Sequence, residues 1–439
     1  MIKNRVTLFI MPVVFLLAAT AGRAQSPVAS PTPPPLVRPR VVAAPATATP
    51  TPTPAPMIIT PGQTPTVLSP ATQGGVFAPQ GTQPPGVIVP LLPPVTALPR
   101  PLAQPLPPGK IDARTEEALR LMKTRPLQTA MIPVSAYSVR LAAFDPDASQ
   151  IHTVTLPKEI FLRLGSDVTL ITSLGTRVRL RIVRSNYVNT AVTINDATGR
   201  QLIPLAVEYP IEKFGRFREM AYYTSVHPVL LSPELVRAGQ TYVRTMLDLA
   251  AKRLKAKGIT ITPQIVDVAE RLCIVEHVDH DRFRRENRLA LYEEVFALYA
   301  LNELDTYRYS VSSAGAGGMV QMIPSTYQMV RRRHPGVGLN PDFVTGMRNH
   351  GNALEAMLLY MRDTWNDLLL SSDVTYALDA KLATQPELLS AGYNSNPAKL
   401  GGYIRRGGSA WRALIPRETQ IYLEIYRSLD SLVPMKTRV

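Results

Sequence analysis

The chain has 439 residues and a hydrophobic content of 45%, which can supply more than one globular core and excludes a wholly disordered protein. Its formal net charge of +15 predicts anionic partners, with nucleic acid, a membrane surface and cell-wall carboxylates all compatible. Cys273 is the single cysteine, so an internal disulfide and two-thiol redox or zinc motifs are excluded. Its apolar surroundings predict a buried side chain.

The N-terminal segment, residues 1–24, has the pattern of a secretory signal peptide. Lys3 and Arg5 precede an apolar run at residues 8–19, and small residues up to Ala24 offer cleavage sites. An uncleaved anchor is the competing interpretation, but the run is short for a membrane span of roughly 20 residues. We therefore expect a periplasmic or otherwise extracytoplasmic protein without a stable membrane span after cleavage. The absence of a nearby cysteine argues against a lipoprotein.

Residues 25–109 contain no Asp or Glu and hold 25 of the 42 prolines of the chain. Such a composition cannot bury enough apolar surface to offset the entropy of ordering. We expect a disordered Pro-rich linker, partly in polyproline II conformation. A spacer role and a featureless filler are both open, because no proline motif here identifies a ligand.

Residues 110–230 are expected to form a short helix followed by a β-rich accessory domain. β-branched and apolar residues alternate with polar ones in short runs between turn formers, which predicts a small barrel or sandwich. The helix is expected at residues 113–123, and the strands at 138–143, 153–156, 168–172, 177–184, 191–194 and 202–208. No catalytic constellation occurs here, so we expect a docking or positioning role.

Residues 231–439 change to a period of about 3.6, which predicts an all-α domain. Helices are expected at residues 235–256, 263–278, 282–303, 354–369, 386–393 and 417–429. The fold class is therefore expected to be α+β and multidomain. It would combine the Pro-rich linker, the β-rich domain and the C-terminal helical domain.

Residues 303–326 carry the pattern with the clearest chemistry, and they read ELDTYRYSVSSAGAGGMVQMIPST. Glu303 ends an apolar helix, and the glycines at 315–318 allow close backbone approach. We expect residues 319–321 to pack across Glu303. Apolar packing raises the pKa of a carboxyl, so that it can donate a proton near neutrality, as a glycosidic general acid must. Taken alone, this pattern is not specific.

The same stretch resembles the signature of the soluble lytic transglycosylase family, whose fold is lysozyme-like. The family pattern has an E-S pair and, after a spacer, S-x-x-G-A-x-G-L-M-Q-x-M-P-x-T. The ungapped matches are Glu303, Ser312, Gly315, Ala316, Gly318, Gln321, Pro324 and Thr326. Residues 391–396 are similar to the A-Y-N-A-G block, and residues 416–422 to the late E-T-x-x-Y block. The resemblance covers about residues 262–429.

The resemblance implies a peptidoglycan lytic transglycosylase, a carbon–oxygen lyase that needs no cofactor. Glu303 would be the single acid/base. It would protonate the β-1,4 bond between N-acetylmuramic acid and N-acetylglucosamine, then deprotonate the C6 hydroxyl of the sugar and leave a 1,6-anhydro end. The implied substrate-binding residues are Ser312, Gln321, Ile323, Tyr393, Asn394 and Glu418. Leu304, Val320 and Ile323 depart from the family pattern. These departures are expected to affect the affinity for the sugar more than the proton transfer.

Three alternatives stay open. A lysozyme-type hydrolase would need a second carboxylate, about 6.5–9.5 Å away in the inverting case, and Asp305 does not share a helix face with Glu303. A non-catalytic scaffold would bind peptidoglycan glycan strands without cutting them. The enzyme could also serve an envelope-spanning secretion or motility apparatus.

Two charged segments invite other interpretations. His277 and His280 lie three residues apart, but no third ligand motif accompanies them, so we expect a solvated helix end and no metal. The basic run at residues 331–334 resembles a nucleic-acid patch. On an exported protein, wall carboxylates or a solvated face are the preferred interpretation, and nucleic acid is not expected as a partner.

Overall fold

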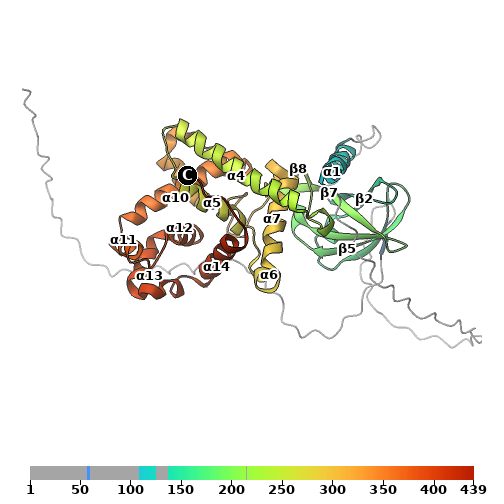
Figure 1. Cartoon of the computed structure of the whole chain (residues 1–439). Coiled ribbons are helices and arrows are strands. Elements are labelled where there is room, and N and C mark those ends of the chain that lie inside the picture. The colour runs from blue at the N-terminus through green and yellow to red at the C-terminus, as the bar shows by residue number, and fades with distance from the viewer. Residues whose placement is uncertain (1–56, 60–107, 125–136, 214) are drawn as a thin grey trace, which may run out of the picture. The chain divides into compact units, whose positions relative to one another are not determined.

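The computed structural model describes residues 57–59, 108–124, 137–213 and 215–439 (Figure 1). The predicted signal peptide and nearly all of the predicted linker lie outside these residues. Within the described ranges, no helix is both long enough and apolar enough to cross a membrane.

A curled antiparallel sheet occupies the first large described part of the chain. Its strands are β2 (Ser138–Asp145), β3 (Gln150–Pro157), β4 (Asp167–Ile171), β5 (Arg177–Arg184), β6 (Ala191–Asp196), β7 (Gln201–Lys213) and β8 (Arg216–Tyr223). The order is β1-β4-β5-β6-β7-β2-β3, with β8 added to β7, and the short β1 (Met57–Ile59) is parallel to β4. Helix α1 (Pro108–Lys123) places Ile111, Ala118 and Met122 in one apolar cluster with residues of β2 and β7.

The predicted strand positions are confirmed for β2 to β7, whereas β8 was not predicted. Its sequence, RFREMAYY, starts with exposed and charged residues and lacks a regular apolar alternation. It is a strand because the long β7 offers it an antiparallel partner along Val207–Lys213. Pairing with β7 thus makes this segment a strand, although its local sequence does not predict one.

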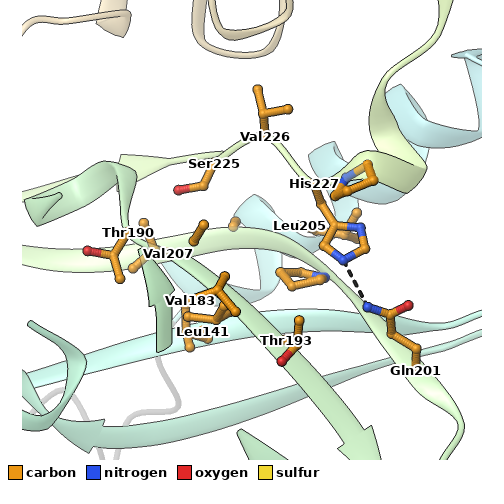
Figure 2. A pocket seen from close by; sticks show the side chains of 15 residues that line it. Leu141, Val183, Thr190, Thr193, Gln201, Leu205, Val207, Ser225, Val226 and His227 are labelled. Atoms are coloured by element: carbon orange, nitrogen blue, oxygen red, sulfur yellow. Dashed lines mark hydrogen bonds between the residues drawn. The ribbon is translucent and has the colours of Figure 1, made fainter. Parts of the chain in front are cut away.

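The sheet opens between β6 and β7 because Pro204 has no N–H to donate to a ladder. The two strands pair only at Ile194–Leu202 and Asn195–Gln201. The opening is a pocket of about 250 Å³, lined largely by apolar side chains such as Leu205 (Figure 2). At its rim the Gln201 and His227 side chains hydrogen-bond at 3.0 Å.

The C-terminal part is helical, as predicted. The longer helices are α4 (Pro233–Ala256), α5 (Pro263–Val275), α7 (Arg288–Asn302), α8 (Pro324–Arg333), α10 (His350–Leu369), α12 (Gln385–Asn394) and α14 (Arg417–Leu432). The shorter ones are α6 (His280–Arg285), α9 (Phe343–Arg348), α11 (Ser372–Asp379) and α13 (Leu400–Gly407). Every residue of α5 from Ile265 to Val275 is buried, and α4, α7, α10, α12 and α14 pack against this helix. A helix that is buried on all sides in this way is typical of the centre of a domain.

One predicted helix is divided. The stretch 282–303 contains a break at Glu286, because Asn287 starts a new helix by accepting the Ala290 N–H at 3.1 Å. A side-chain acceptor at an N-cap competes with continuation of the preceding helix. The result is the short α6 followed by α7.

Candidate active site

Glu303 follows α7 and is exposed, with a φ of 42°. The expectation that residues 319–321 pack across its carboxyl is wrong. The residue before it, Asn302, is bound to the sheet through Thr224 at 2.8 and 2.9 Å, and this contact fixes where α7 ends. Within the described part of the chain, no hydrogen bond or ion pair joins the Glu303 carboxylate to another residue.

A different glutamate lies where the second and third blocks of the resemblance meet the end of α5. Glu276 follows the buried helix α5 and is itself half-buried. The Tyr422 hydroxyl, from α14, donates a hydrogen bond to Glu276 Oε1 at 2.7 Å. The pKa of Tyr393, on α12, is raised well above its usual value by burial first and by the charge of Glu276 second. Glu276 therefore lies close to both phenols.

The glycine-rich segment forms a tight antiparallel hairpin beside Glu276. Gly317 bridges both Val311 and Met322. Gly318 has a φ of 66°, and a Cβ at this position would collide with the Met347 carbonyl oxygen, so only glycine suits both the conformation and the packing.

Two side chains hold the hairpin at successive carbonyl groups. The Tyr393 hydroxyl donates to the Val320 carbonyl at 2.6 Å. His277 donates from Nε2 to the Met319 carbonyl at 2.9 Å. Because His277 is the direct neighbour of Glu276, the hairpin and the glutamate are tied to the same end of α5.

The remaining predicted site residues have mixed environments. Ser312 Oγ accepts the Ala316 N–H at 3.0 Å and so closes the hairpin turn. Gln321 has a φ of 45°, and its amide donates to the Gly318 carbonyl at 2.8 Å and to Ser310 Oγ at 3.1 Å. These contacts fix the conformation of the hairpin.

Three further predicted residues lie near the ends of helices. Ile323 is 36% exposed at the start of α8. Asn394 ends α12, and its Oδ1 accepts the Thr419 hydroxyl at 2.8 Å. Glu418 precedes Thr419 in the first turn of α14, so the second and third blocks are joined directly.

The expectation of a solvated helix end at His277 is wrong. Its ring stacks on Tyr307 with a centroid separation of 3.4 Å and an interplanar angle of 2°. Burial lowers the pKa of His277 to about 3, so the ring is neutral at physiological pH. Among the described residues, no group of three or more His, Cys, Asp or Glu side chains could hold a metal ion.

Cys273 is buried, as predicted, and burial raises the pKa of its thiol, which makes it a packing residue rather than a nucleophile. The basic run at 331–334 ends α8, where Arg333 and His334 contact Asp363. Part of its charge is therefore neutralised within the molecule.

Sequence reasoning missed Glu276 because the ungapped match pointed to Glu303. The local pattern could not separate the two residues, because Glu276 and Glu303 each follow a helix rich in apolar residues. Comparison with protein-family models, with curated proteins and with solved structures found no match.

Proposed function

We propose that the chain is a lytic transglycosylase that cleaves peptidoglycan glycan strands with a lysozyme-like helical domain. The observation that carries this proposal is that three segments far apart in sequence meet at the end of α5, where Glu276 and His277 lie. The hairpin contributes its Met319 and Val320 carbonyls, α12 contributes Tyr393 and α14 contributes Tyr422. These are the segments that resemble the family blocks.

Glu276 is a better acid/base than Glu303 in this proposal. It is half-buried among phenol rings, whereas Glu303 is exposed. The match to the family pattern then contains an insertion, α6 and α7, and Glu276-His277 takes the place of its E-S pair. Glu276 would protonate the glycosidic oxygen and then accept the proton of the sugar's C6 hydroxyl, so that the anhydro ring closes and the bond to the leaving sugar breaks.

The family resemblance supports a lyase rather than a hydrolase. A hydrolase needs a second carboxylate, as base or as nucleophile. Intramolecular attack by the C6 hydroxyl needs none.

The setting follows from the N-terminal sequence and from charge. The signal-peptide pattern of residues 1–24 and the net charge of +15 support action outside the cytoplasm on a carboxylate-bearing polymer. A role within an envelope-spanning apparatus is a narrower form of the same proposal, and the Pro-rich composition of residues 25–109 supports it.

The test is digestion of purified peptidoglycan by the wild type, Glu276→Gln and Glu303→Gln, with mass spectrometry of the products. We expect 1,6-anhydro-muramyl ends from the wild type and from Glu303→Gln. Glu276→Gln should lower the rate by about 100-fold or more, because the amide keeps the shape but cannot exchange the proton.

Other outcomes would redirect the proposal. Reducing ends would identify a hydrolase. Loss of activity in Glu303→Gln with full activity in Glu276→Gln would restore the ungapped match. Binding of glycan without release of products by the wild type would favour the non-catalytic scaffold.

A further inference from the structure

Tyr307 lies where the curled sheet meets the helical part of the chain. It packs against the apolar core of the sheet and against the core built around α5. Its φ of 55° is in the left-handed region, which costs energy for a residue with a Cβ and persists only where surrounding contacts impose it.

The backbone around Tyr307 is held firmly. The Thr306 hydroxyl donates to the Leu298 carbonyl at 3.0 Å, and His350 Nε2 donates to the Thr306 carbonyl at 2.8 Å. Leu298 itself belongs to the core of the sheet. The position of Tyr307 is therefore defined by both parts of the chain.

From the sheet, the contact to Tyr307 is made by the last residue of β8. Tyr223 is buried there, and burial raises the pKa of its phenol, while a hydrogen bond with the Tyr307 backbone acts in the opposite direction. The next residue, Thr224, binds Asn302 at the end of α7. The end of β8 is thus hydrogen-bonded both to the end of α7 and to the segment that follows α7.

The His277 ring connects Tyr307 to the candidate acid, Glu276. The Tyr307 ring lies flat on His277, whose Nε2 donates to the Met319 carbonyl of the hairpin. His277 directly follows Glu276. The imidazole therefore links the Tyr307 ring to the hairpin and to the end of α5.

We propose that Tyr307 is a positioning residue through which the curled sheet sets the orientation of Glu276, by way of Tyr223 and His277. The inference rests on the proposed function for the role of Glu276. Tyr307 itself touches no substrate in this scheme. Its contribution is geometric, and a displacement of about 1 Å in a reacting group can cost roughly 100-fold in rate.

The experiment compares Tyr307→Leu, Tyr307→Phe and Tyr223→Phe with the wild type on purified glycan strands. Tyr307→Leu removes the stacked ring and should lower kcat by about tenfold or more, with KM within about twofold. Tyr307→Phe keeps the ring and should restore most of the activity. Tyr223→Phe removes a single hydroxyl from the sheet side and should lower kcat in the same direction. Tyr376→Leu, at an exposed tyrosine, is the matched control.

A second measurement does not depend on activity. The NMR resonances of the His277 ring should shift in Tyr307→Leu and in Tyr223→Phe, and should stay unchanged in Tyr376→Leu. An inactive wild type would contradict the proposed function, while these resonances would still test the coupling. Unchanged kcat in Tyr307→Leu would overturn the positioning role. Unchanged kcat and resonances in Tyr223→Phe would overturn the link to the sheet, and this variant is conservative enough to fold.

Discussion

At the scale of single residues, the candidate site contains a half-buried histidine whose surroundings disfavour the charged ring. His277 has a donor to the Met319 carbonyl and a stacked tyrosine ring, and these contacts suit a neutral imidazole. Its pKa is lowered by burial first, to about 3. A charged ring at this place would lose hydration without gaining a counter-ion.

The stability of the protein should therefore fall at acid pH in a defined window. The unfolded chain binds a proton on this histidine near its ordinary pKa of 6.5, while the folded chain binds it only near 3. Between these values the unfolded state holds the extra proton, so the free energy of unfolding decreases as pH decreases.

Urea unfolding from pH 7.5 to pH 4 checks this expectation. In His277→Gln, where the amide can still donate to Met319, the slope should be smaller than in the wild type by about 1.4 kcal/mol per pH unit within the window. Above the window the two slopes should agree, which serves as the internal control. Identical slopes throughout would mean that His277 is protonated in the folded protein.

At the scale of elements, the hairpin at residues 310–322 depends on glycine for two separate reasons. Gly318 has a positive φ, and any side chain would meet the Met347 carbonyl. The hairpin carries the Val320 and Met319 carbonyls that Tyr393 and His277 bind. Its shape therefore determines the surroundings of Glu276.

Gly318→Ala should destabilise the protein by about 1–3 kcal/mol and lower glycan cleavage, because it adds both backbone strain and a collision. Gly336→Ala is the matched control, since a Cβ there meets no atom within 4 Å and its φ is not positive. Thermal unfolding and product release would be measured for both variants. Equal stability of the two variants would show that a side chain at position 318 causes neither strain nor a collision.

At the scale of the whole molecule, Arg438 forms ion pairs with residues of two core helices, α4 and α5. Arg438 binds Asp248 at 2.7 Å, Asp267 at 2.8 Å and Glu270, and its own side chain is only 11% exposed. Burial raises the pKa of Glu270, and the charge of Arg438 lowers it. The C-terminus is thus joined to α4 and α5, far away in sequence.

Arg438→Met should lower the free energy of unfolding by about 3–5 kcal/mol, because the buried carboxylate of Asp267 loses its ion-pair partner and that of Glu270 keeps only Arg244. The exposed Lys436 is a suitable control, and Lys436→Met should change stability by less than about 0.5 kcal/mol. Denaturant titration of both variants measures their free energies of unfolding. A loss of similar size in Lys436→Met would show that the effect is not specific to the ion cluster.

Sequence alone determined the elements whose apolar residues repeat regularly. The two-residue alternation placed β2 to β7, and the 3.6-residue period placed α4, α5, α10, α12 and α14, because each pattern reports burial of one face of a single segment. The burial of Cys273 followed from the same information. None of these features needs knowledge of a distant partner.

Tertiary structure decided the rest. β8 exists because β7 pairs with it. The hairpin is held at the end of α5 because Tyr393 and His277 bind its carbonyls, and Tyr422 joins α14 to Glu276 at the same end. Glu303 and Glu276 both end apolar helices, so local pattern cannot rank them. The proposed function prefers Glu276, because its neighbour His277 binds the hairpin although α6 and α7 separate the two in sequence.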